Sequence, residues 1–163
     1  MKRIPLSQGR EALVSDCDYK YLMQWKWYFS RQSTGSGGYA ARCTPRPHKR
    51  TIKMHKVVAA RKGLTGEIDH RNQDKLDNRR SNLRQATRSQ NKANCGVSSS
   101  NKSGFKGVSC YKTNQWQASI RINGKTVHLG HFHGTSARKR AAARAYNRAA
   151  SRYFGVYAVL NKV

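Results

Sequence analysis

The sequence predicts an α+β protein: a small N-terminal α/β layer, then a ββα finger, then a three-stranded antiparallel sheet packed on one helix. Three observations carry this prediction. Short strand-like runs are separated by turn-forming residues in both halves of the chain, an Asn- and Asp-rich loop lies between two further short strands, and a late alanine-rich stretch has helical periodicity. We expect domains over residues 1–94 and 105–163, joined by a flexible, Ser/Gly/Asn-rich linker at 95–104.

The N-terminal layer, residues 1–66, combines one helix with several strands. Asp16 is placed to cap a short helix through CDYKYLMQWKW, in which Leu22 and Trp25 or Trp27 lie near one face. The runs WYFS, GYAAR and TIKMHKVVA are strand-like, and STGSGG forms a turn between the first two. The aromatic residues expected in the core, rather than in base stacking, are Trp25, Trp27, Tyr28 and Phe29.

The middle segment, residues 67–94, has the pattern of a compact ββα finger. GEIDH and LRQAT are short strands around the polar loop, and RSQNKAN is a helix with Ser89 near its start. This helix would bring Asn91 back against the end of the strand that contains Asp69 and His70.

The C-terminal segment, residues 105–163, has three strand-like runs, FKGVSCY, WQASIRI and KTVHLGHF, joined by TNQ and NG. An Asn-Gly turn between alternating runs is a strong hairpin signal. A helix follows over about Ser136 to Tyr153, and Gly155 is placed to end it. The apolar stripe of this helix is Ala142, Tyr146, Ala149, Ala150 and Tyr153.

Strand alternation gives the C-terminal sheet two faces. The apolar side chains, expected under the helix, are Trp116, Ala118, Ile120, Ile122, Val108, Cys110, Val127 and Leu129. The opposite face carries Ser109, Tyr111, Gln117, Ser119, Arg121, Thr126 and His128. Such a hydrogen-bonding and cationic sheet can enter the major groove and contact base edges.

The charge balance points to a polyanionic partner. The chain has 33 Lys and Arg against 7 Asp and Glu, a formal net charge of +26 and a pI near 10.8. All seven acidic residues lie at or before Asp77, so the C-terminal half is purely cationic. This balance favours DNA, RNA or an anionic membrane surface as the partner, and solubility alone is a poor explanation for it.

The cysteines and the hydropathy pattern exclude other classes of protein. None of the four cysteines forms a C-x-x-C pair, which disfavours a zinc site, and we expect reduced thiols that are mostly small core residues. The N-terminus lacks the apolar region of a secretory signal, and no run approaches the roughly 18 apolar residues of a membrane helix. We expect a cytoplasmic protein.

The residues Asp69-His70, Asn82 and Asn91 form a pattern with a chemical use. Phosphodiester hydrolysis needs a water deprotonated near neutral pH and a cation on the phosphate. Histidine, with an unperturbed pKa of about 6.5, suits the base. Asp and Asn oxygens suit Mg²⁺, and a second Asn can orient the imidazole. A polar loop built from turns explains Asn72, Asp74, Asp77 and Asn78 but not this ordered pattern.

The stretch IDHRNQDKLDNRRSNLRQATRSQNKAN resembles the HNH endonuclease family of the ββα-metal superfamily, in its phage and intron homing-type branch. The resemblance implies that Asp69 and Asn91 bind one Mg²⁺ or Mn²⁺, that His70 is the general base, and that Asn82 orients it. Asn91 stands where the family name has its last His. We favour a structural role for His55 and assign none to Glu67. The arginines expected to contact phosphates are Arg79, Arg80, Arg84 and Arg88.

Residues 103–161 resemble the APETALA2/ethylene-response-factor DNA-binding domain, through KGVS, WQASIRI, LGHF, AAARAYNRAA and FGVYAVLN. The resemblance implies a sheet in the major groove with a helix behind it. The positions that match DNA contacts are Lys106, Ser109, Tyr111, Ser119, Arg121, Thr126 and His128. Only Lys106 and Arg121 keep a basic group, so the base preference does not carry over. A second helical stripe, Arg140, Arg144, Arg148 and Arg152, is interpreted as a solvated face.

Together these features predict a metal-dependent, site-selective DNA endonuclease of homing type. We expect it to act as a monomer on double-stranded DNA without a protein partner, in a bacterial or phage-infected cell. The expected product is a nick with 5′-phosphate and 3′-hydroxyl ends. One alternative is a non-catalytic, sequence-specific DNA-binding regulator with a degenerate nuclease finger. Another is an RNA-binding protein, although the sheet lacks paired stacking aromatics.

Overall fold

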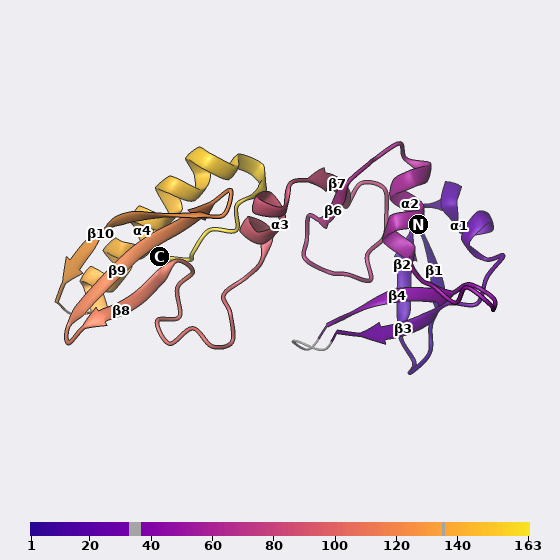
Figure 1. Cartoon of the computed structure of the whole chain (residues 1–163), viewed down its shortest axis with the longest axis horizontal. Coiled ribbons are helices and arrows are strands. Elements are labelled where there is room, and N and C mark those ends of the chain that lie inside the picture. Colours follow the sequence, from indigo (N-terminus) through magenta and orange to yellow (C-terminus); the bar gives the residue numbers. More distant parts are fainter. Residues whose placement is uncertain (33–36, 135) are drawn as a thin grey trace. The chain divides into compact units, whose positions relative to one another are not determined.

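The computed structural model describes residues 1–32, 37–134 and 136–163, shown in Figure 1. The chain divides into two compact units, Met1–Ala86 (unit 1) and Thr87–Val163 (unit 2). Short helices and small antiparallel sheets occur in both units, which confirms the predicted α+β class. The first four residues of the predicted STGSGG turn, 33–36, lie outside the described residues.

Unit 1 is built from small antiparallel sheets and two helices among its described residues. Strand β1 pairs with β2, β4 lies between β3 and β5, and β6 pairs with β7. The bounds are β1 Lys2–Pro5, β2 Glu11–Val14, α1 Asp16–Leu22, β3 Tyr28–Arg31, β4 Gly38–Cys43, β5 Thr51–Lys53, α2 Met54–Arg61, β6 Glu67–His70 and β7 Leu83–Ala86.

Helix α1 is shorter than predicted. Its N-cap is Ser15, and Asp16 is the first helical residue rather than the cap. The helix ends at Leu22, before the tryptophans that the prediction included. The chain then turns back, and the indole Nε1–H of Trp27 donates to the Leu22 carbonyl at 2.8 Å. This bond satisfies one of the carbonyls that a helix end leaves unpaired.

The predicted strand TIKMHKVVA is wrong for most of its length. Only Thr51–Lys53 forms a strand, and the chain continues directly into helix α2. The buried residues Met54 and Val58 lie one helical turn apart, as do His55 and Ala59. A helix therefore turns all four toward the core, which a strand with its period of two could not do.

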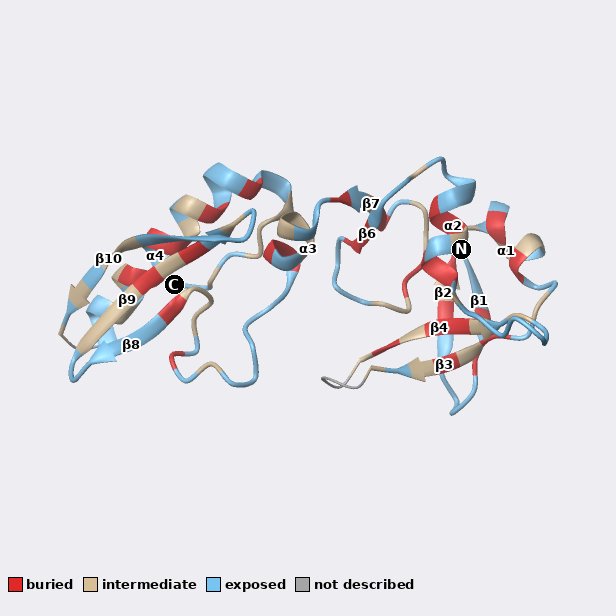
Figure 2. Cartoon of the chain, in the orientation of Figure 1, coloured by how far each residue is buried: buried red, intermediate tan, exposed pale blue. Residues whose placement is uncertain are grey.

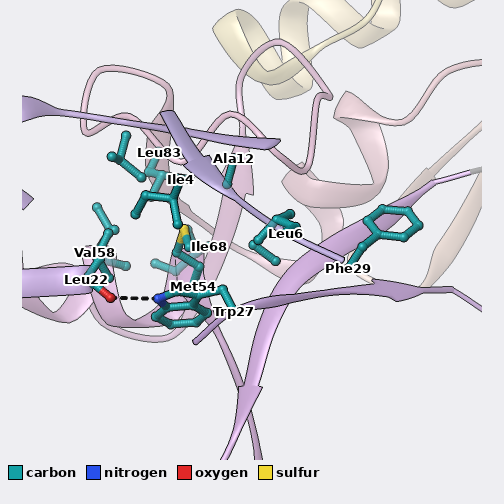
Figure 3. Close-up of a cluster of buried hydrophobic side chains, with 13 residues drawn as sticks. Ile4, Leu6, Ala12, Leu22, Trp27, Phe29, Met54, Val58, Ile68 and Leu83 are labelled. Carbon is teal, nitrogen blue, oxygen red and sulfur yellow. Dashed lines mark hydrogen bonds between the residues drawn. The ribbon is translucent and has the colours of Figure 1, made fainter. Parts of the chain in front are cut away.

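The core of unit 1 is a single cluster of buried apolar side chains from the strands and both helices (Figures 2 and 3). Trp27 and Phe29 are buried as predicted, whereas Trp25 and Tyr28 are half-buried. Trp25 is covered by the guanidinium of Arg42, whose Cζ lies 4.2 Å from the ring centroid. The cluster comprises Ile4, Leu6, Ala12, Val14, Leu22, Trp27, Phe29, Ala40, Met54, Val58, Ala59, Ile68 and Leu83.

Unit 2 begins with a short helix and continues as a three-stranded sheet packed on a long helix, with the strand order β10-β9-β8. The sheet and helix were predicted from the sequence. The Asn123-Gly124 turn has positive φ at both residues, as the shortest hairpins require. The bounds are α3 Arg88–Asn94, β8 Val108–Lys112, β9 Gln115–Ile122, β10 Lys125–His133, α4 Ser136–Phe154 and a 3₁₀ turn η1 Gly155–Tyr157.

The segment predicted as a linker lies inside unit 2. Its end is held by Ser103, which is buried and donates from its hydroxyl toward Asn101 Oδ1 at 2.8 Å and the Val108 carbonyl at 2.8 Å. Asn101 also donates to the Phe105 carbonyl at 3.0 Å. This part of the segment is therefore fixed onto the start of the sheet.

In unit 2, the side chains that are buried between the sheet and α4 differ from the predicted set at a few positions. Helix α4 buries Phe154 instead of Tyr153, whose exposed fraction is 50%. Cys110 and Val127, predicted on the covered face, are exposed. The buried stripe advances in steps of four residues along α4 and ends under the last turn. Its members are Ala142, Tyr146, Ala150 and Phe154.

The backbone conformation and packing at position 107 explain why the KGV motif has a glycine there. Its φ is +72°, and a Cβ at this position would lie 2.0 Å from the Tyr146 ring and 2.7 Å from the Ser119 carbonyl. Only glycine combines this left-handed conformation with such a close approach. Burial raises the pKa of Tyr146 to about 12, so the phenol under the sheet is neutral.

The cysteine prediction is corrected in one respect. The thiols of Cys17, Cys43, Cys95 and Cys110 are free, as expected, but all four are exposed rather than in the core. Within the described ranges, no helix has both the length and the apolar character needed to cross a membrane.

Candidate active site

The strand pair β6–β7 positions the predicted catalytic residues. Asp69 lies opposite Arg84, and His70 lies opposite Leu83. Only 4% of Asp69 and 6% of His70 is exposed. Both predicted strands of the finger are thus formed, and the Asp-His pair ends β6 where the polar loop begins.

Asn82 closes that loop at its base. Its Oδ1 accepts from the Asn72 N–H at 3.0 Å, and its Nδ2 donates to the Asp77 carbonyl at 2.8 Å. The Asn82 carbonyl also accepts from the Arg71 N–H at 3.0 Å. These bonds give Asn82 a loop-closing position beside β6, in addition to the orienting role that the sequence resemblance implies.

Asn78 is a loop residue whose side chain contacts His70. Its Oδ1 lies 3.4 Å from His70 Nε2, while its Nδ2 donates to the Leu76 carbonyl at 3.1 Å. An amide oxygen can only accept, so this contact favours the tautomer with hydrogen on Nε2. Asn78 is fully buried, and its N–H donates to the Leu13 carbonyl at 2.8 Å. Sequence analysis assigned it only to loop formation.

The two loop aspartates shape the backbone, as predicted. Asp74 Oδ1 accepts from the Leu76 N–H at 2.9 Å, which is an Asx turn. Asp77 is buried and accepts from Asn72 Nδ2 at 2.8 Å and from the Arg79 guanidinium at 2.6 and 2.7 Å. Burial raises the pKa of Asp77, but the bonds from Arg79 outweigh it and the net shift is downward. This carboxylate is therefore ionised at neutral pH.

His55 from α2 packs against His70. Their ring centroids are 5.1 Å apart with the rings at 78°, and the Tyr39 ring is 5.1 Å from His55. Burial, followed by the nearby His70, lowers the pKa of His55 to about 3. Burial also lowers the pKa of His70, against the opposing effect of Asn78. Both imidazoles are neutral at neutral pH, the state that a base requires.

The Asp69 carboxylate forms an ion pair with Arg84, which belongs to the same unit. Arg84 Nε and Nη2 each lie 2.8 Å from Asp69 Oδ2, and only 13% of the Arg84 side chain is exposed. No group of three His, Cys, Asp or Glu side chains suited to a metal occurs among the residues described. A hard divalent cation that takes most of its ligands from water and phosphate needs fewer protein ligands than that. The donor chemistry of Asp69 fits such a cation, in competition with Arg84.

Three of the four arginines predicted at phosphates have protein partners that the sequence did not indicate. Arg79 pairs with Asp77, and Arg84 with Asp69. Arg80 binds the buried Asp18 of α1 through Nε at 2.7 Å and Nη2 at 2.8 Å. Arg88 differs from these three because it is exposed on α3.

The predicted helix around Asn91 is confirmed as α3 in unit 2. Thr87 Oγ1 accepts from the Gln90 N–H at 3.2 Å, and Gln90 Oε1 accepts from the Thr87 N–H at 2.8 Å. This reciprocal capping box satisfies two N–H groups that a helix start leaves unpaired. Asn91 is half-buried on this helix.

The outward face of the C-terminal sheet holds the predicted residues in three cross-strand rows. Ser109 lies opposite Gln117, Ser119 opposite His128, and Arg121 opposite Thr126. Tyr111 is exposed at the end of β8.

His131 also lies on this face, although the sequence pattern does not predict it there. A bulge between His128 and Gly130 makes Leu129 an extra residue and pairs His131 with Gln117. The His131 ring lies 4.5 Å from Tyr111 and 4.4 Å from His128 between centroids. Simple alternation puts His131 on the covered side, and the only hint of the bulge is the glycine at position 130.

Lys106, also predicted to contact DNA, points its ammonium toward the end of α3. It is half-buried, and its ammonium donates to the carbonyls of Lys92, Ala93 and Cys95 at the end of α3. Burial lowers its pKa. These bonds satisfy helix-terminal carbonyls, so the side chain joins α3 to the sheet.

Two comparisons with known proteins bear on this site. Residues 64–93 match the family model described as HNH endonuclease. An uncharacterized HNH endonuclease of Acanthamoeba polyphaga mimivirus is 29% identical over 161 residues, covering 96% of this chain and 77% of the viral protein. No solved structure matches the chain significantly. The two matches bear out the prediction of a nuclease enzyme.

Proposed function

We propose that this chain is a metal-dependent, site-selective DNA endonuclease of homing type that nicks one strand of duplex DNA. The observation that carries the proposal is the buried Asp69-His70 pair at the end of β6, with Asn78 beside the imidazole. The family match covers this whole arrangement and continues through α3.

His70 is the proposed general base. Its burial keeps the imidazole neutral, and the contact of Nε2 with Asn78 directs the proton-accepting lone pair to Nδ1. A water held at Nδ1 would lose its proton as it attacks the phosphorus. His55 and Tyr39 pack around the ring and restrict its rotation.

Asp69 and Asn91 are the proposed ligands of one Mg²⁺ or Mn²⁺. The assignment of Asn91 rests on the sequence pattern and on the family match, both of which extend through residue 91. A bound divalent cation would stabilise the charge that develops on the phosphate and its leaving oxygen. Asp69 can bind the metal when its ion pair with Arg84 breaks. The Arg84 guanidinium would then be available to donate to a phosphate oxygen.

One such site hydrolyses one strand at a time, so a monomer would leave a nick with 5′-phosphate and 3′-hydroxyl ends. Unit 2 is the proposed recognition element, similar to the APETALA2/ethylene-response-factor domain, with its outward sheet face in the major groove. The residues proposed to contact DNA there are Ser109, Tyr111, Gln117, Ser119, Arg121, Thr126, His128 and His131. Lys106 is left out, because its ammonium is already bonded within unit 2.

Mg²⁺-dependent nicking of supercoiled plasmid that contains candidate target DNA tests the proposal. Wild-type protein should convert plasmid to the open circle, EDTA should stop the reaction, and His70→Ala should lower the rate by at least about 100-fold. His48→Ala is the matched control, since His48 is an exposed histidine outside the finger.

The ion pair on Asp69 favours one alternative, a DNA-binding regulator whose finger does not bind metal. In that case wild type and His70→Ala would bind duplex DNA equally well and neither would nick it in Mg²⁺ or Mn²⁺. Preferential binding to RNA in a competition experiment would contradict both functions.

A further inference from the structure

A cationic pocket in unit 2 lies between α3 and the turn that joins β9 to β10. Its volume is about 570 Å³. Three of its side chains are exposed cations, Arg88 and Lys92 from α3 and Arg121 from β9. The full lining is Thr87, Arg88, Ser89, Lys92, Arg121, Asn123 and Gly124.

Hydrogen bonds hold the two walls of the pocket together. Ser89 Oγ accepts from the Asn123 N–H at 3.1 Å, which ties α3 to the β-turn. Arg121 Nε donates to the Gly124 carbonyl at 3.1 Å, which holds the start of its guanidinium over the turn. The two walls of the pocket and the Arg121 side chain are therefore organised before a ligand arrives.

The charge of the pocket has no carboxylate side chain to balance it. Residues 78–163 contain no Asp or Glu, so Arg88, Lys92 and Arg121 have none within their own unit. Arg80 and Arg84 of unit 1 differ, since each binds an aspartate there. A ligand for this pocket must bring negative charge and several acceptor oxygens, and a phosphodiester does both.

We propose that this pocket binds a backbone phosphate of duplex DNA and extends the recognition surface from the sheet to α3. Arg121 belongs to both parts, because it lines the pocket and also lies in the outward row opposite Thr126. The inference rests on the proposed function, because it takes duplex DNA as the partner. An acidic peptide shares the charge but not the continuity with the sheet, and the experiment separates the two.

The test is the salt dependence of duplex DNA binding by the full chain in EDTA, measured by fluorescence anisotropy. Each phosphate contact contributes about 0.9 to the slope of log affinity against log salt. Because the pocket is proposed to hold one phosphate, the pocket variant should lose roughly 0.9 from the slope. It carries Arg88→Gln, Lys92→Gln and Arg121→Gln.

The control variant removes the same charge from the exposed stripe of α4 and should keep a slope close to the wild-type value. It carries Arg140→Gln, Arg144→Gln and Arg148→Gln. A double variant, Arg88→Gln with Lys92→Gln, keeps the Arg121–Gly124 bond and should lose up to roughly 0.9. Circular dichroism checks that each variant is folded.

Equal slopes for the pocket and control variants overturn the pocket proposal while leaving the proposed function intact. Failure of the wild-type chain to bind duplex DNA overturns both. Polyglutamate serves as the peptide probe. If the pocket variant loses polyglutamate binding but keeps the wild-type slope on DNA, the pocket belongs to an acidic protein segment and the proposal is wrong.

Discussion

Replacing Asp18 by asparagine should destabilise unit 1 by about 3 kcal/mol. The Asp18 side chain is fully buried on α1 and joins α1 to both α2 and the finger loop. It accepts from Arg80 at 2.7 and 2.8 Å and from Arg61 at 2.9 Å. Breaking a buried ion pair costs about 3–5 kcal/mol, and the lower end applies because both arginine side chains are 33% exposed and regain water.

Native-state hydrogen exchange with peptide resolution measures this loss in unit 1 separately from unit 2. Asp16→Asn is the matched control, because Asp16 lies on the same helix but is 65% exposed and pairs with the exposed N-terminal ammonium. The control should change stability by less than about 0.5 kcal/mol. If the amides of unit 1 are equally protected from exchange in Asp18→Asn and Asp16→Asn, the ion pairs of Asp18 do not stabilise unit 1 and the assignment is refuted.

The same pair should give a defined pH dependence. The bonds from Arg80 come first among the causes that lower the pKa of Asp18 in the folded chain, and burial opposes them. An unfolded aspartate has a pKa of about 3.9. A lowered folded pKa gives stability that is complete above the unfolded value and lost as pH falls through the folded value. The stability difference between wild type and Asp18→Asn should be constant near neutral pH and narrow below about pH 4.

Three further predictions concern unit 2 and the candidate active site. Gly107→Ala should destabilise unit 2 by about 3 kcal/mol in urea unfolding, from left-handed strain plus a clash with the Tyr146 ring. Gly124→Ala, with φ +85° but nothing within 4 Å of a new Cβ, should cost only about 1 kcal/mol, and equal losses would contradict the clash. Asn78→Ala should slow plasmid nicking about 10- to 100-fold with DNA affinity unchanged. An unchanged rate would show that Asn78 does not orient His70. Arg84→Gln should tighten Mn²⁺ binding in titrations without DNA, and an unchanged affinity would show that the ion pair does not compete with metal.

The two strands and the helix expected in the ββα finger are formed as predicted, because their signals are local. Thr87 caps the helix three residues before Gln90, and Asp69-His70 ends a four-residue strand next to the loop. Each of these features is decided by neighbours in the sequence. The hairpin at Asn123-Gly124 was predictable for the same reason, since the turn type requires those residues.

The elements that were missed depend on distant partners. Helix α2 was taken for a strand, because the buried faces of Met54 and Val58 are recognisable only against the core that they join. The ion pair between Asp18 and Arg80 spans 62 residues, and no spacing in the sequence indicates it. The bulge at Leu129 shifts His131 to the outward face by a single residue, which alternation alone cannot reveal.

Asn78 illustrates a limit of motif-based prediction at the site. The sequence pattern emphasises Asn82, which closes the loop, while an amide that contacts His70 Nε2 belongs to Asn78. Asn78 reaches that position because its backbone is bonded to Leu13 of β2, far away in the sequence. The chemistry of the site was predictable from residue types, but the identity of its supporting residue depended on the fold.

The absence of Asp and Glu from residues 78–163 has a consequence for how this protein is handled. Like charges that lack internal partners repel one another, so a bound polyanion relieves that repulsion as well as satisfying individual side chains. Any ligand that binds only the folded state adds about 2.7 kcal/mol of stability at a hundred times its dissociation constant. Residual nucleic acid or heparin in a preparation should therefore raise the melting temperature of unit 2. Purification that strips the polyanion completely should give the least heat-stable sample.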